Sequence, residues 1–126
     1  MLRFDFRGEY DDWRGFSFQI KYIIYKNHII YYMSLSDYSN MNEAQRNATK
    51  YDKQLVLKRS TRKDKKYMIT ANDKTVHFGQ MGYEDYTKHK DEARRESYLK
   101  RAQAIRGNWR KDKYSPNNLA INILWR

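Results

Sequence analysis

The N-terminal third of the chain carries the alternation of apolar and polar residues that is typical of β-strands. The segment 16–24 begins with six residues that alternate in this way, and the segment 29–35 is rich in Ile and Tyr. Asn27 lies between the two segments, and Asn tolerates the positive φ of a tight turn. These features predict a β-hairpin. The polar residues 34–50 that follow predict a linker, with a short helix at residues 42–48.

Three short β-prone segments follow in the second half of the chain, at residues 54–59, 66–71 and 75–79. Residues 72–74 (Asn-Asp-Lys) separate the last two segments, and such residues are typical of a hairpin turn. Strands joined by short connections pair with their neighbours in antiparallel fashion. The pattern therefore predicts a small three-stranded antiparallel sheet.

Residues 86–106 predict one long helix, because they include neither Gly nor Pro and are rich in helix-forming residues. Acidic side chains lie toward the start and basic ones toward the end, and Gly107 provides a C-terminal stop. Ser115-Pro116 suits the start of a short last helix at residues 116–125, with a strand as the open alternative. The whole pattern predicts an α+β fold with an N-terminal β-hairpin extension, the three-stranded sheet, one long helix and a short C-terminal element.

Charge divides the chain into two unequal parts. Residues 1–48 contain six Lys/Arg and six Asp/Glu, whereas residues 49–126 contain twenty Lys/Arg and nine Asp/Glu, which accounts for the whole net charge of +11. We therefore predict a neutral, aromatic and β-rich extension of residues 1–48 and a basic α+β module of residues 49–126. A basic module favours an acidic partner, such as nucleic acid, an acidic protein surface or lipid headgroups.

The residues that carry catalytic or metal chemistry do not form a recognisable set. The chain has no Cys, which excludes disulfides, thiolate catalysis and Cys-based zinc sites. The three His residues are widely spaced, and the acidic residues lie in highly charged stretches. There is no Gly-rich phosphate loop and no nucleophile motif. We expect no metal, no cofactor and no catalysis, so the chain is not predicted to be an enzyme.

Basic residues interleaved with aromatic ones are the candidate binding groups. Residues 58–66 carry six Lys/Arg, offset only by Asp64, and more cations lie on the predicted long helix. Such clusters suit contacts with phosphates or with acidic protein surfaces. The candidates for an acidic partner are Arg59, Arg62, Lys63, Lys65, Lys66, Arg94, Arg95 and Lys100. Trp109 and Tyr114 are the candidate stacking platforms, and the candidate contacts of an N-terminal interaction arm are Tyr22, Tyr25, Tyr31 and Tyr32.

A set of short motifs extends over residues 54–126. It comprises Lys65-Lys66-Tyr67, VHFG at 76–79, GYEDYTKHKD at 82–91, Arg94-Arg95, Tyr98, Asn108-Trp109 and Leu124-Trp125. This set resembles a family of small basic proteins of large double-stranded DNA viruses, of the chlorella-virus, mimivirus-like and iridovirus-like groups. The string 76–91 is its most specific part. Two features depart from the family: Ala102 follows Arg101 where the family tends to have His, and residues 115–123 lack the usual Gly and aromatic residues.

The resemblance implies a viral setting more directly than an activity. Viruses of these groups have icosahedral capsids in which small minor proteins cement arrays of the major capsid protein. We therefore expect a minor structural (capsid cement) protein, which binds acidic surfaces of major and other minor capsid proteins. Its expected location is the virion and, during assembly, the cytoplasm of the infected cell. The alternative is a nucleic-acid-binding protein that packages or contacts the viral genome.

The most apolar stretch, residues 16–33, is not expected to span a membrane. Gln19, Lys21 and the polar residues 26–28 interrupt it, and charges near the centre of a membrane-spanning helix are costly. A position close to an internal viral membrane remains an open alternative.

Overall fold

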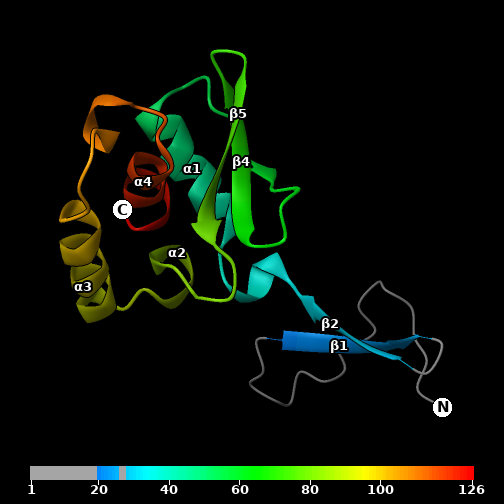
Figure 1. Cartoon of the computed structure of the whole chain (residues 1–126). Helices are drawn as coiled ribbons and strands as arrows, with labels where there is room; N and C mark the ends of the chain where they lie inside the picture. The colour runs from blue at the N-terminus through cyan, green and yellow to red at the C-terminus, as the bar shows by residue number, and fades with distance from the viewer. Residues whose placement is uncertain (1–19, 26–27) are drawn as a thin grey trace.

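The computed structural model describes residues 20–25 and 28–126, with side-chain environments from residue 34 onward. Its first two strands, β1 (Ile20–Tyr25) and β2 (His28–Met33), form an antiparallel pair. This pair is the predicted hairpin, and in Figure 1 it projects away from the remainder of the chain. Residues 16–19 of the predicted first strand lie outside the described residues.

A second sheet has the predicted three antiparallel strands in the order β3-β4-β5. Its strands are β3 (Lys58–Arg59), β4 (Lys65–Ala71) and β5 (Lys74–Gln80). The β4–β5 turn consists of Asn72 and Asp73, whose φ angles of 53° and 61° are those of a tight two-residue hairpin turn. Lys74, which was predicted in the turn, is paired with Ala71 as the first residue of β5.

The predicted linker is instead part of the folded body. A short 3₁₀ turn, η2 (Leu35–Asp37), leads into α1 (Met41–Tyr51), and the side chain of Asn40 accepts a hydrogen bond from the Glu43 N–H at the start of α1. Ala44 and Ala48 are fully buried, four residues apart on a helix that is otherwise polar. α1 runs through the predicted division between residues 48 and 49, and residues on both sides of that point contribute to one core.

The predicted long helix is two helices, α2 (Tyr86–His89) and α3 (Glu92–Gln103). Lys90 separates them with a φ of 55°, the left-handed conformation that ends a helix. Asp85 and Asp91 each accept hydrogen bonds from backbone N–H groups at the start of the following helix. The two Asp residues thus act as N-caps rather than as the acidic first turn of a single helix.

The C-terminal element is helical, which decides between the two alternatives left open by the sequence. After the 3₁₀ turn η3 (Trp109–Lys111), Ser115 caps α4 (Pro116–Leu119), and its hydroxyl accepts from the Asn118 N–H at 3.2 Å. The chain continues directly into the π-helical turn η4 (Ala120–Leu124).

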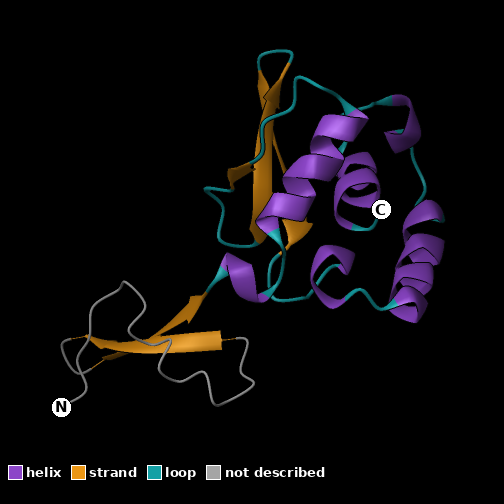
Figure 2. Ribbon diagram, turned by 180° about the vertical axis from the view of Figure 1, so that it is seen from behind, coloured by secondary structure: helices purple, strands orange, loops and turns teal. Residues whose placement is uncertain are grey.

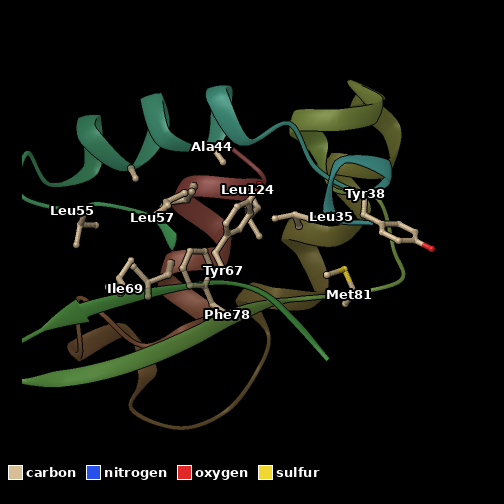
Figure 3. Packing of buried hydrophobic residues seen from close by; sticks show 13 residues of the cluster. Leu35, Tyr38, Ala44, Leu55, Leu57, Tyr67, Ile69, Phe78, Met81 and Leu124 are labelled. Carbon is tan, nitrogen blue, oxygen red and sulfur yellow. The ribbon is translucent and has the colours of Figure 1, made fainter. Parts of the chain in front are cut away.

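One hydrophobic core joins these elements. In Figures 1 and 2 the helices gather on one side of the β4–β5 pair. Figure 3 shows side chains of the sheet, of α1 and of the C-terminal helix meeting in the space between them. The buried members are Leu35, Tyr38, Ala44, Ala48, Leu55, Leu57, Tyr67, Ile69, Phe78, Met81, Leu119, Ile123 and Leu124. The α+β fold with its antiparallel sheet is therefore as predicted, with four of the core residues coming from the segment that was predicted to be a linker.

Candidate functional site

A buried ion pair lies at the junction of η2, β4 and α2. The Lys66 ammonium is 3.0 Å from a carboxylate oxygen of Asp85, and the two side chains are 2% and 1% exposed. Lys66 also donates a hydrogen bond to the Tyr38 carbonyl at 3.2 Å. Tyr38 belongs to the segment before α1, and Asp85 begins α2, so this single lysine connects three parts of the chain that are distant in sequence.

A chain of hydroxyl groups extends this ion pair. The second Asp85 oxygen accepts hydrogen bonds from the N–H and the hydroxyl of Thr87, and Thr87 contacts the Ser39 hydroxyl at 3.2 Å. The Tyr67 hydroxyl donates to Ser39 at 2.7 Å. Burial is the main reason that the pKa of Tyr67 rises to about 12, with a further contribution from the nearby negative charge of Asp85. Its hydroxyl is therefore a neutral donor at neutral pH.

Lys66, which was predicted to contact an acidic partner, is engaged inside the chain, and its side chain is only 2% exposed. Adjacent residues of a strand point to opposite faces, and both Lys66 and Tyr67 are buried, so both faces of β4 are covered at this point. Burial lowers the pKa of the Lys66 ammonium, whereas the charge of Asp85 and its hydrogen bond act in the opposite direction. We infer that the ion pair between Lys66 and Asp85 holds α2 against the sheet.

The other cations of the predicted cluster lie at the surface. Lys58, Arg59, Arg62 and Lys63 are exposed, and Lys65 is half-buried. Arg62 forms an exposed ion pair with Asp64 at 3.1 Å. Within the described residues, Arg59 and Lys63 have no acidic side chain within ion-pair distance. We call residues 58–65 the cationic loop. It offers several positive charges to solvent on the outer side of the β3–β4 connection.

Arg94, Arg95 and Lys100, the candidate cations that were predicted on one long helix, have different environments. Lys100 is exposed, and no ion pair of it occurs in the part of the chain that is described. Arg94 is 4.0 Å from Glu84. Arg95 is half-buried: it pairs with Glu92 at 3.0 Å, and its Nε donates to the Trp125 carbonyl at 2.8 Å. Arg95 thus holds the C-terminal segment in place, whereas Lys100 and Arg94 remain accessible.

The two candidate stacking platforms are engaged within the chain. The Trp109 indole N–H donates to the Ile105 carbonyl at 2.7 Å, and the Arg110 guanidinium lies 4.3 Å from the centre of its ring. The Tyr114 hydroxyl donates to Asp52, with Lys113 close to its ring. Both side chains are half-buried. The side chains of the candidate arm residues Tyr22, Tyr25, Tyr31 and Tyr32 lie outside the described environments, so their role stays a prediction.

A groove of about 570 Å³ lies between the end of β5, α3 and the C-terminal segment. Its lining consists of Lys66, Gly79, Gln80, Tyr83, Glu84, Ala93, Arg94, Ser97, Tyr98, Arg101, Ala120, Leu124 and Trp125. The residues of this groove come from four separate segments of the chain, so no spacing in the sequence indicates it. Eight of the lining residues belong to the short motifs of residues 54–126: Lys66, Gly79, Tyr83, Glu84, Arg94, Tyr98, Leu124 and Trp125.

Other kinds of site have no support among residues 20–25 and 28–126. No group of three or more His, Asp or Glu side chains there could hold a metal ion. None of the helices described is long and apolar enough to cross a membrane.

Residues 55–102 match a family that is described as a family of unknown function (DUF5754). The matched range covers β3 to β5, α2 and nearly all of α3, and it falls within residues 54–126, over which the short motifs extend. No curated protein and no solved structure matches the chain. The matched range includes the cationic loop, Lys66, Asp85 and the α3 side of the groove, but neither α1 nor the C-terminal helix that complete the core.

Proposed function

We propose that this chain is a minor structural (capsid cement) protein of a large icosahedral DNA virus, which binds acidic surfaces of capsid proteins without catalysis. The observation that carries the proposal is the cationic loop. It presents Lys58, Arg59, Arg62 and Lys63 at the surface, with Asp64 as the only acidic residue of the loop. A set of exposed charges of one sign favours association with a surface of the opposite sign. The viral setting rests on the resemblance of residues 54–126.

The same charges would also attract nucleic acid, and the surroundings of the aromatic residues help to choose between the two partners. Binding of single strands depends on aromatic rings that are free to stack on bases. Arg110 lies over the Trp109 ring, and Tyr114 is hydrogen-bonded to Asp52. These contacts favour a protein partner, while duplex binding through phosphates alone remains the outcome that the experiment has to separate.

The first experiment is mass spectrometry of purified particles of the virus that encodes this chain, after nuclease digestion and salt washing. We expect the chain to remain with the particles after nuclease treatment, because its partner is a protein. Absence of the chain from washed particles would contradict the proposal, and loss on nuclease treatment would assign it to the genome.

The second experiment measures retention of the purified full chain on immobilised poly-L-glutamate and on duplex DNA at rising NaCl concentration. We expect retention on poly-L-glutamate to fall strongly in the variant R59Q/R62Q/K63Q, because it removes three exposed charges of the loop. The control variant R106Q/K111Q/K113Q removes the same charge from exposed positions elsewhere and should keep most of the retention. Nanomolar duplex binding with a steep salt dependence would instead support the nucleic-acid alternative.

A further inference from the structure

The groove between β5, α3 and the C-terminal segment combines an apolar base with a cationic edge. Gly79, Ala120 and Leu124 lie at its base, and α3 forms one side (its position is seen in Figure 1). Gly79 keeps this base compact, since a Cβ atom there would be 2.8 Å from the Leu124 side chain and 3.2 Å from Cβ of Lys66. A volume of about 570 Å³ is within the usual range of ligand pockets, roughly 300–1,000 Å³.

The charges at the edge of the groove favour an acidic ligand. Arg94 and Arg101 are seven residues apart on α3, so they lie on the same side of the helix about 10 Å apart along its axis. The third cation of the lining, Lys66, is neutralised by Asp85. Glu84 lies 4.0 Å from Arg94, whereas no ion pair of Arg101 occurs within the described residues. The lining therefore keeps an excess of positive charge, which is centred on Arg101.

The aromatic side chains of the groove are arranged for packing rather than for base stacking. The rings of Tyr98 and Trp125 stack on each other, with centroids 4.1 Å apart and planes 8° apart. Each ring therefore covers one face of the other, and His89 lies 5.3 Å from Trp125. Tyr83 is the large apolar side chain that remains accessible at the edge, with 70% of its surface exposed. An apolar side chain of a ligand would pack between Tyr83 and the Leu124 base.

We propose that this groove binds an acidic peptide segment of a partner protein, an inference that rests on the proposed function and gives it a second contact site. Two carboxylates of the segment would pair with Arg94 and Arg101, and apolar side chains between them would occupy the base of the groove. In an extended peptide, residues at positions i, i+2 and i+4 lie on one face, and the first and last of them are about 13 Å apart. Two flexible arginine side chains that start about 10 Å apart along the helix can reach both carboxylates. Bidentate pairing with carboxylates is the geometry for which guanidinium groups are suited.

The test is a titration of the isotope-labelled full chain with the peptide acetyl-Gly-Glu-Ser-Leu-Ser-Glu-Gly-amide, followed by two-dimensional NMR. In the extended form of this peptide both Glu residues and the Leu lie on one face. We expect shifts of the signals of Ser97, Tyr98 and Trp125, which line the groove. The variant Arg101→Gln should weaken binding roughly tenfold, as expected for loss of a charge-assisted contact. Arg106→Gln is the matched control: it removes the same charge from an exposed position just beyond α3, which does not line the groove.

The outcomes separate this inference from the proposed function. If the peptide leaves the groove signals unchanged, or if both variants weaken binding equally, the groove is not the site, whereas the cationic loop keeps its role so long as R59Q/R62Q/K63Q loses poly-L-glutamate retention. The same peptide with Gln in place of Glu should bind at least several-fold more weakly; equal binding would contradict the role of the two arginines. If a single-stranded oligonucleotide shifts the groove signals at lower concentration than the peptide, the inference is overturned in favour of a nucleic-acid site.

Discussion

Lys63 and Lys66 lie three residues apart in one basic run, yet they occupy opposite environments. Lys63 is exposed on the cationic loop, and Lys66 is 2% exposed and paired with Asp85 inside the protein. The loop region is exposed to solvent, so substitutions there should have little effect on folding. The Lys66 region is an interior junction that holds α2 and the segment before α1 against the sheet. Charge density along a sequence therefore does not distinguish a binding surface from a structural contact.

Truncation of the chain should give the largest effect, because a deletion that ends at residue 48 removes part of the interior junction and leaves the cationic loop intact. We expect residues 34–126 to unfold in one cooperative transition, whereas residues 49–126 should not. The longer deletion removes Leu35, Tyr38, Ala44 and Ala48 from the core, together with the Tyr38 carbonyl that accepts from Lys66. Burial of a large apolar side chain such as Leu35 stabilises the folded state by about 1.5–3 kcal/mol. The free energy of unfolding of a whole domain is only about 5–15 kcal/mol.

Urea denaturation followed by circular dichroism measures this effect. A cooperative transition of residues 49–126, with a midpoint close to that of residues 34–126, would contradict the assignment of α1 to the core.

Removal of the two lysines should give the next largest difference. Lys66→Met leaves the Asp85 carboxylate buried without its partner, and we expect it to lower the free energy of unfolding by about 3–5 kcal/mol. Lys63→Met, the matched control, should leave the urea midpoint nearly unchanged because its side chain is exposed. Similar midpoints for the two variants would show that the two positions do not differ as the structure indicates.

Two glycines test how closely the elements approach each other beside Lys66. Gly79 and Gly82 have φ angles of +84° and +98°, so replacement of either by Ala introduces backbone strain of about 1 kcal/mol. Only at Gly79 would the new Cβ also overlap Leu124, whereas nothing lies within 4 Å of it at Gly82. We expect Gly79→Ala to lower the free energy of unfolding by about 2–3 kcal/mol and Gly82→Ala by about 1 kcal/mol. Equal losses would argue against the close contact.

The smallest effect concerns pH and His89, which contacts Trp125 on the interior side. Burial and the charge of Arg94 lower the pKa of His89 below its usual 6.5, although Glu84, Asp91 and Asp85 oppose the shift. The unfolded chain then takes up a proton at higher pH than the folded chain. Neutral His89 therefore makes its full contribution to the free energy of unfolding above pH 6.5. This contribution is lost as the pH falls through 6.5 toward the lower pKa of the folded chain.

We expect thermal melting temperatures to fall less between about pH 7 and about pH 5 in His89→Asn than in the unsubstituted chain. Asn retains an oxygen that can accept from the Asp91 N–H, as Nδ1 of His89 does at 2.9 Å. If the melting temperature falls by the same amount between the two pH values in His89→Asn and in the unsubstituted chain, His89 does not contribute to the pH dependence.

The sequence predicted those elements whose signals are local. Asn72 and Asp73 marked the β4–β5 turn, Ser115 and Pro116 marked the start of α4, and alternation marked the hairpin of β1 and β2. It predicted a short helix at residues 42–48, which lies within α1, but not that this helix packs into the core, because two Ala residues on a mostly polar helix give only a narrow apolar face. It also failed at Lys90, because left-handed Lys residues are uncommon and the capping role of Asp91 resembles an acidic helix start.

The candidate site also has one part that the sequence could predict and one part that it could not. The exposed cations of the loop could be recognised as a cluster, because exposure of charged residues is the usual outcome and needs no partner. The groove could not be recognised, because its residues come from β5, the segment before α2, α3 and the C-terminal helix. Their proximity depends on how these elements pack and not on any spacing in the sequence.

The sequence by itself determined the class of fold, the turns and caps, and the presence of a strongly basic second half. Each of these depends on residues that are neighbours in the chain, or on composition alone. Only the tertiary structure decided which basic residues face solvent, where the folded body begins, and that Arg94 and Arg101 border a common groove with Trp125. The physical reason is that burial depends on what covers a side chain, and the partners that hold the Lys66 ammonium inside the protein belong to Tyr38 and Asp85, both distant from it in the sequence.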